Sequence, residues 1–202
     1  MCYNVKGDTM RSMYDVVIVG AGPAGLFAAY ELIEKNNKLK ILILDRGKKV
    51  ANRFCPMNKN KIACVNCEPC NILSGYGGAG TFSDGKLNFI PKLGKSDLFK
   101  YMGQEEAYSL IDYTEEIFNK FKMDSDVYPS NMEEAQKIKK KVALTGARLL
   151  LIKQKHLGSD YLPEYIDGIC AYLTEHGVTL LENTNVIDIQ SESSDKHKVI
   201  YC

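Results

Sequence analysis

The residues best suited to chemistry in this chain are cysteines that precede a glycine-rich loop. Cys64, Cys67 and Cys70 are spaced three residues apart, as in the bacterial ferredoxin run C-x-x-C-x-x-C. The fourth cysteine of that run is missing downstream, but a Cys55-Pro56 pair lies upstream. Four thiolates at these positions could close a tetrahedral zinc site or hold an iron–sulfur cluster. The alternatives are a dithiol–disulfide pair and free thiols in an ordered loop.

A second candidate site is the glycine sequence that follows the apolar run of residues 14–20 and precedes a stretch of helical period. Strand, glycine turn and helix in this order are the context in which G-x-G-x-x-G binds a dinucleotide. Gly20 permits the tight turn, Gly22 lets a pyrophosphate approach the main chain, and Gly25 lets helix and strand pack closely. A turn that serves only close packing is the alternative. The residues predicted to hold a dinucleotide at this helix N-terminus are Gly20, Gly22, Pro23, Ala24 and Gly25.

An acidic residue completes this pattern. Asp45 lies about 20 residues beyond Gly25, at the end of a second apolar run over residues 39–47. At the end of the second strand an acid can accept hydrogen bonds from ribose hydroxyls. The two strands and the helix between them form a βαβ unit, which is parallel and right-handed. Residues 14–47 therefore predict a dinucleotide-binding element.

The glycine-rich loop after the cysteines is interpreted as a further phosphate-binding element. Its glycines allow close approach and positive φ, while its hydroxyl side chains add hydrogen-bond donors. A flexible turn is the alternative, because glycine clusters are common in loops. The residues predicted to contact the cofactor here are Gly77, Gly78, Ala79, Gly80, Thr81 and Ser83.

These motifs together resemble those of flavoproteins with two dinucleotide-binding domains. VVIVGAGPAGLFAAYEL with ILILDRG resembles the element that holds the ADP half of FAD, which implies that Asp45 binds the adenosine ribose and that Arg46 adjoins it. NTNVIDI resembles the later strand in which Val186 contacts the adenine through its main chain. SGYGGAGTFSDGKLN resembles the loop that closes over the FAD pyrophosphate. The wider series of Cys-Pro, C-x-x-C-x-x-C and GGAGTFSDGK resembles a family of bacterial FAD-dependent dehydrogenases, the NAD(P)/FAD-dependent oxidoreductases.

The resemblance implies an α/β fold, a Rossmann-type FAD-binding domain of the glutathione-reductase kind with a partly helical insertion. More than 130 residues separate Asp45 from Val178, a layout that favours FAD over NAD. Family members are more than twice as long and carry a later G-D motif that is absent here, so we expect a fragment truncated at its C-terminus. We expect an N-terminal extension at 1–13, the FAD-binding βαβ unit at 14–95, a helical insertion at 96–160 and an incomplete return to the FAD-binding domain at 161–202.

The resemblance also implies the activity. We expect an FAD-dependent oxidoreductase that passes hydride or electrons between an organic substrate or NAD(P)H and the flavin. Iron–sulfur is preferred slightly over zinc at the cysteines, because a flavin exchanges electrons singly or in pairs. The alternatives are a redox-sensing or cysteine–metal module without turnover, and an FAD-dependent enzyme that modifies nucleic acid. The net charge of +1 makes a nucleic-acid partner unlikely and leaves a small molecule as the expected partner.

Composition and periodicity give the remaining expectations. A hydrophobic content of 45% and a charged content of 25% are typical of a globular protein. The sequence contains no run of about 18 apolar residues, the length that would indicate a membrane span. The first residues do not resemble a signal peptide, so we expect a cytoplasmic protein. Periodicity predicts helices over 96–122 with a break at Gly103, over 131–144 and over 162–176, and a strand over 147–156. Cys170 is expected to lie in the core.

Overall fold

The computed structural model of the protein describes residues 13–122, 125–158, 161–194 and 196–202. The predicted N-terminal extension, residues 1–13, lies outside this part of the chain except for Met13. Among the described residues, no helix has the length and apolar character needed to cross a membrane.

The chain forms two compact units, which are described separately. The first unit comprises the segment that ends at Ser83 together with Ile166–Cys202. The second unit is Asp84–Tyr165. The domain limits predicted after residues 95 and 160 both fall inside the second unit.

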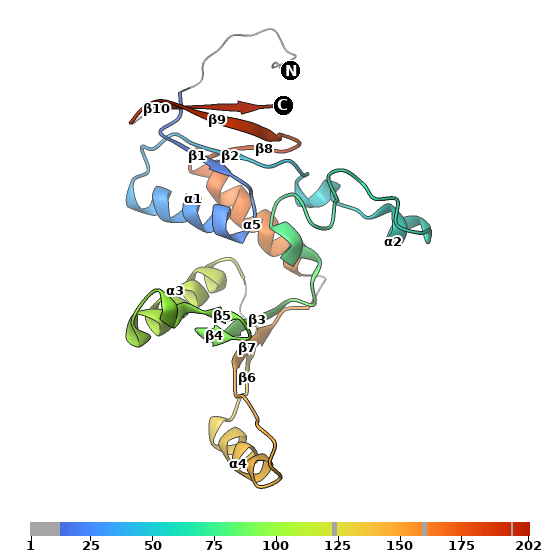
Figure 1. The fold of residues 1–202 in the computed structure, drawn as a ribbon, viewed down its shortest axis with the longest axis vertical. Coiled ribbons are helices and arrows are strands. Elements are labelled where there is room, and N and C mark those ends of the chain that lie inside the picture. The colour runs from blue at the N-terminus through green and yellow to red at the C-terminus, as the bar shows by residue number, and fades with distance from the viewer. Residues whose placement is uncertain (1–12, 123–124, 159–160, 195) are drawn as a thin grey trace. The chain divides into compact units, whose positions relative to one another are not determined.

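A parallel sheet with the strand order β1-β2-β8 forms the centre of the first unit (Figure 1). Its strands are β1 (Val16–Val19), β2 (Ile41–Leu44) and β8 (Thr179–Leu181). All four side chains of β2 are buried, as expected for an apolar strand that is covered on both faces. The helix α1 (Pro23–Lys35) connects β1 to β2. The predicted α/β fold of Rossmann type is therefore confirmed.

Helices and a β-ribbon lie on opposite faces of this sheet. Figure 1 shows α1 and α5 (Leu162–Glu175) on one face, and the antiparallel pair β9 (Val186–Ser193) and β10 (Lys196–Tyr201) on the other. Helix α1 turns Leu26, Ala29, Tyr30 and Ile33 into the core. The rings of Tyr30 and Tyr172 are 5.8 Å apart, which joins α1 to α5. These layers bury the strands that carry the glycine turn.

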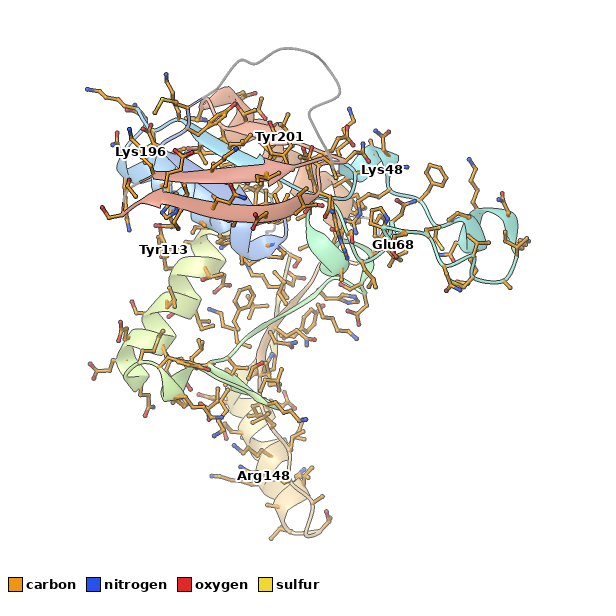
Figure 2. All side chains as sticks on the ribbon, turned by 45° about the horizontal axis from the view of Figure 1, so that its top comes forward. Lys48, Glu68, Tyr113, Arg148, Lys196 and Tyr201 are labelled. Carbon is orange, nitrogen blue, oxygen red and sulfur yellow. The ribbon has the colours of Figure 1, made fainter. Side chains whose placement is uncertain are left out.

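A long excursion within the first unit follows β2 and ends at the glycine-rich loop. It contains the 3-10 turn η1 (Val50–Asn52), the short helix α2 (Pro56–Asn60) and the 3-10 turn η2 (Gly78–Phe82). Figure 1 shows α2 near the outer end of this excursion, and Figure 2 labels two of its residues, Lys48 and Glu68. Apart from these short turns, the segment is irregular.

The second unit contains a small antiparallel sheet and two helices. The sheet has the order β3 (Lys86–Phe89), β7 (Lys153–His156) and β6 (Val127–Tyr128). A separate hairpin pairs β4 (Lys92–Leu93) with β5 (Ser96–Asp97). Glu115 of the longer helix contacts the ammonium groups of Lys153 and Lys155, which joins this helix to β7. The longer helix is α3 (Gln104–Lys120), and the other is α4 (Met132–Ala143); the 3-10 turn η3 (Leu98–Lys100) precedes α3.

Two predictions for this unit need correction. The helix expected from residue 96 begins only at Gln104, because Asp97 pairs instead with Lys92 across the hairpin at 2.6 Å. The strand expected over 147–156 is limited to Lys153–His156, because its partner β3 supplies only four residues. The helix over 131–144 is confirmed, and Asn131 caps it by accepting a hydrogen bond from the main-chain N–H of Glu134.

Candidate dinucleotide-binding site

A cavity of about 330 Å³ opens in the first unit where β1 and β2 end. Of the residues predicted to hold a cofactor, six line it: Gly20, Gly22, Asp45, Arg46, Gly78 and Val186. The others do not line it: Pro23, Ala24, Gly25, Gly77, Ala79, Gly80, Thr81 and Ser83. Its remaining lining residues are Val19, Leu44, Leu73, Ser74, Gly75, Thr184 and Asn185. A larger hollow of about 1200 Å³ follows one side of α3 in the other unit and contains none of the predicted residues.

The glycine turn has the geometry that its sequence predicts. Gly20 has a φ of +105°, and its N–H donates to the Leu44 carbonyl at 2.7 Å, which ties the turn to the end of β2. A Cβ at Gly25 would lie 2.0 Å from the carbonyl oxygen of Gly20, so helix and turn approach too closely for any other residue. A Cβ at Gly22 would meet nothing within 4 Å. Gly22 is the N-cap of α1, so the open space in front of it faces the first, unpaired N–H groups of a helix.

Asp45 has a structural task that the sequence did not reveal. Its carboxylate is buried, accepting a hydrogen bond from the main-chain N–H of Ala21 at 2.8 Å and another from that of Gly47 at 2.7 Å. It therefore holds the glycine turn against the end of β2. Each carboxylate oxygen has a second lone pair, so Asp45 can still accept from a ribose hydroxyl in the cavity.

Residues beyond Asp45 complete the cavity wall on this side. Nε of Arg46 donates to the Ser74 hydroxyl at 3.1 Å, which links the end of β2 to the glycine-rich loop. The main-chain N–H of Thr184 donates to the Asp45 carbonyl at 2.8 Å. Val186, the first residue of β9, follows closely and reaches the cavity with it.

The two glycine segments, far apart in the sequence, meet at the cavity. The N–H of Gly77 donates to the Ala21 carbonyl at 2.8 Å, and a Cβ at Gly78 would lie 3.5 Å from Cα of Gly22. Thr81, however, points inward, since its hydroxyl is buried and donates to the Tyr76 carbonyl at 3.3 Å. Ser83 is exposed, and its N–H closes a turn onto Gly80. Of the loop residues predicted to contact a cofactor, only Gly78 lines the cavity, and the hydroxyl groups of Thr81 and Ser83 do not.

Arg53 is a buried residue of the site that the sequence analysis missed. Its guanidinium hydrogen-bonds the Thr81 hydroxyl and main-chain carbonyls that lie just before the glycine-rich loop and within it. Burial lowers the pKa of Arg53, while the negative charge of Asp45 opposes that shift. An arginine within an irregular segment carries no spacing signal, so only the three-dimensional structure identifies it.

The structure does not form the predicted metal site. Among the described residues, no three His, Cys, Asp or Glu side chains are grouped to hold a metal ion. Cys55 occupies the N-cap position of α2 without a side-chain capping hydrogen bond, while the exposed thiol of Cys64 donates to the Asn66 amide oxygen at 3.6 Å. The spacing of Cys64, Cys67 and Cys70 brings thiols together only if the main chain wraps around an ion, and here it follows an irregular course. Cys55, Cys64, Cys67 and Cys70 are all free thiols.

Thiol labelling checks this description of the cysteines. Burial raises the pKa of Cys170 to about 12, so its thiol stays protonated at neutral pH, whereas Cys64 is exposed. Because the thiolate is the reactive form, iodoacetamide should modify Cys64 at least ~10-fold faster than Cys170. Peptide mass spectrometry after timed labelling measures both rates, and labelling in concentrated urea is the control, where the rates should converge. Equal rates in the folded protein would contradict this assignment.

Two curated proteins match parts of the sequence. An uncharacterized protein of Clostridium beijerinckii is 40% identical over 85 residues, which cover 42% of this chain and 15% of that protein. The mitochondrial L-2-hydroxyglutarate dehydrogenase of Dictyostelium discoideum is 41% identical over 56 residues, which cover 28% of this chain and 13% of the enzyme. The matched segments therefore span less than a sixth of these relatives.

Solved structures were also matched. Glycine oxidase from Geobacillus kaustophilus is 19% identical with a TM-score of 0.49, and the match covers 93% of this chain and 51% of the oxidase. THI4 from Thermovibrio ammonificans is 15% identical with a TM-score of 0.40, covering 92% of this chain and 45% of that one. The sequence model of one oxidoreductase family matches residues 14–148, which include the glycine turn, Asp45 and the glycine-rich loop. The chain thus belongs to the pyridine nucleotide-disulphide oxidoreductase family, as its motifs predict.

Proposed function

We propose that this chain forms the FAD-binding part of an FAD-dependent oxidoreductase. The observation that carries the proposal is the cavity at the ends of β1 and β2, where Gly20, Gly22, Asp45 and Val186 come together. Membership of an oxidoreductase family supports the same function. The chain spans only part of its relatives, so the activity is proposed for the whole protein to which these residues contribute.

The cavity fits the ADP half of FAD in its chemistry. The bare main chain at Gly22 and the positive end of α1 suit a pyrophosphate, which needs close approach and N–H donors. The carboxylate of Asp45 has lone pairs for the ribose hydroxyls, and the main chain at Val186 lies where an adenine edge can be bound. The glycine-rich loop meets the turn at Gly78, so its main chain would border a diphosphate bound there.

When bound, FAD supplies an acceptor for hydride or electrons. The protein residues described here bind and orient the cofactor, and none of them is proposed to transfer a proton. We propose NAD(P)H or a small organic substrate as the reductant. The cysteines do not fit a metal in this structure, so no electron path is routed through them.

Anaerobic reduction of the FAD-loaded chain tests the redox function. NADH, NADPH and L-2-hydroxyglutarate are added separately, and the visible absorbance of the flavin is followed. L-2-hydroxyglutarate is included because one relative is an L-2-hydroxyglutarate dehydrogenase. At least one of them should bleach the bound flavin faster than it bleaches free FAD, which is the control. Chemical reduction by dithionite without reduction by any of the three would contradict the proposed reductants while leaving FAD binding intact.

A further inference from the structure

Arg53 lies in the excursion between η1 and α2 and is only 4% exposed. An arginine side chain has five N–H donors in a rigid planar arrangement, and here every one of them has an acceptor. Nε donates to the Asn71 carbonyl at 2.9 Å. The other acceptors are the Tyr76 carbonyl at 2.5 Å, the Thr81 hydroxyl at 3.2 Å, the Ile72 carbonyl at 2.8 Å and the Gly78 carbonyl at 2.9 Å.

These contacts replace the hydrogen bonds that regular secondary structure would provide. Residues 71–77 form turns without a helix or strand, so their carbonyls need partners from elsewhere. One guanidinium binds carbonyls that precede Gly75, those of Asn71 and Ile72, and carbonyls that follow it, those of Tyr76 and Gly78, which ties the entry of the loop to its glycines. Gly75 fits closely around it, since a Cβ there would lie 2.7 Å from Cδ of Arg53. The shape of the loop therefore depends on Arg53.

The same loop forms one wall of the cavity. Gly78, whose carbonyl accepts from Arg53, lines the cavity and contacts the glycine turn at Gly22. The preceding residue, Gly77, donates its N–H to Ala21. Moving the Arg53 side chain would move Gly78, and with it the main chain that borders the space in front of α1.

The charge of Arg53 has no ion-pair partner in the described part of the chain. No carboxylate oxygen there lies within 4 Å of its nitrogen atoms, and its hydrogen-bond acceptors are all neutral. The ring of Phe82 covers the guanidinium carbon at 4.8 Å. The negative charge of Asp45 compensates this buried cation only in part. A further anion is therefore favoured nearby, and the neighbouring cavity is where a diphosphate would bind.

We propose that Arg53 is a positioning residue that holds the glycine-rich loop in the shape that receives the diphosphate of the bound dinucleotide. This inference rests on the proposed binding of FAD. It assigns Arg53 to the diphosphate side of the site and not to the adenosine side, where Asp45 and Val186 lie.

The test uses the purified 202-residue chain with Arg53→Lys, which keeps the positive charge but cannot form the planar set of five hydrogen bonds. Arg148→Lys is the matched control, since Arg148 is exposed and follows α4 in the other unit (Figure 2). FAD and AMP are titrated separately, because AMP retains the adenosine and one phosphate but has no diphosphate. We expect Arg53→Lys to weaken FAD binding at least ~10-fold and AMP binding less than ~3-fold. Arg148→Lys should change neither.

A general loss of structure would weaken the binding of FAD and of AMP alike. A larger loss of affinity for FAD than for AMP therefore identifies the positioning role. Unchanged FAD affinity in Arg53→Lys would overturn the inference, as would equal losses for FAD and AMP. If the wild-type chain binds neither ligand, the proposed function fails and the inference fails with it. Should Arg53→Lys not fold, Thr81→Val removes one acceptor with little change of shape and should show the same preference in a smaller degree.

Discussion

Replacing Gly25 with alanine is expected to abolish FAD binding and to destabilise the first unit by roughly 3 kcal/mol. The added Cβ would lie 2.0 Å from the Gly20 carbonyl oxygen and 3.2 Å from Cγ2 of Ile18. The first contact is with main chain that is itself held to β2, so it cannot be relieved by rotating a side chain. Helix α1 must then separate from β1, which moves the helix N-terminus away from the cavity. Thermal unfolding and FAD titration measure the two effects.

Two other glycines serve as controls for this substitution. Gly168→Ala in α5 adds a Cβ to open space within a helix and should stabilise the protein by about 0.5–1 kcal/mol. Gly22→Ala also adds a Cβ that meets no protein atom, but it projects where the diphosphate is proposed to bind. Gly22→Ala should therefore lose FAD affinity at a cost of at most about 1 kcal/mol in stability, because alanine is a poorer N-cap than glycine. Normal stability and FAD binding in Gly25→Ala would refute the described packing.

Replacing Asp45 with asparagine is expected to lower both stability and FAD affinity, the former by about 2–3 kcal/mol. The buried carboxylate accepts hydrogen bonds from the N–H groups of Ala21 and Gly47 through different oxygens. An asparagine amide has only one oxygen, so its NH₂ group would face an N–H donor, and one buried donor would lose its acceptor. The ribose would also lose a charged acceptor, so we expect FAD affinity to fall at least ~10-fold.

Asp15→Asn is the matched control for Asp45→Asn. The Asp15 carboxylate also accepts from a main-chain N–H, that of Lys40 at 2.8 Å, but it is exposed to water. Its replacement should cost at most ~1 kcal/mol and leave FAD binding unchanged, because water can replace the lost bond. Urea unfolding measures the stability of both variants. Similar losses would contradict the claim that burial makes the hydrogen bonds of Asp45 more important for stability than that of Asp15.

The glycine turn could be predicted from the sequence because its information is local. Its strand, turn and helix are contiguous, and two of its glycines answer local steric demands, namely the φ of +105° at Gly20 and the close approach of Gly25 to the Gly20 carbonyl. Asp45 was also found from spacing, although its hydrogen bond to Ala21 was not anticipated. The sequence shows which residues lie at the ends of the strands, but it does not show which oxygen accepts from which N–H.

The second half of the site depends on contacts that no spacing encodes. The hydrogen bond from Gly77 to Ala21 joins segments separated by the whole excursion after β2. Arg53 likewise donates to main-chain carbonyl groups. Every residue has such a carbonyl, so the sequence does not show which residues accept these hydrogen bonds. Thr81 was predicted to face the cofactor, but its hydroxyl accepts a hydrogen bond from Arg53 in the interior. Because that contact depends on Arg53, the sequence of the loop alone could not predict it.

The cysteines have a clear ligand spacing, but the described residues do not group three of them as metal ligands. A C-x-x-C-x-x-C run fixes only the number of residues between thiols, and the main chain decides where those thiols point. Here Asn66 has a φ of 49°, and Cys64 lies exposed on the loop. The pattern predicts a ligand set only when the rest of the segment is shaped around an ion.

The most direct test of FAD binding is an equilibrium titration of the purified chain with FAD and, separately, with FMN, followed by flavin fluorescence. FMN has the same flavin ring as FAD but lacks the adenosine and the second phosphate, which are the groups assigned to Asp45, Val186 and the turn at Gly22. We predict that FAD saturates at one molecule per chain and that FMN binds at least ~100-fold more weakly. Equal affinities for FAD and FMN, or no binding of FAD at all, would contradict the proposed function.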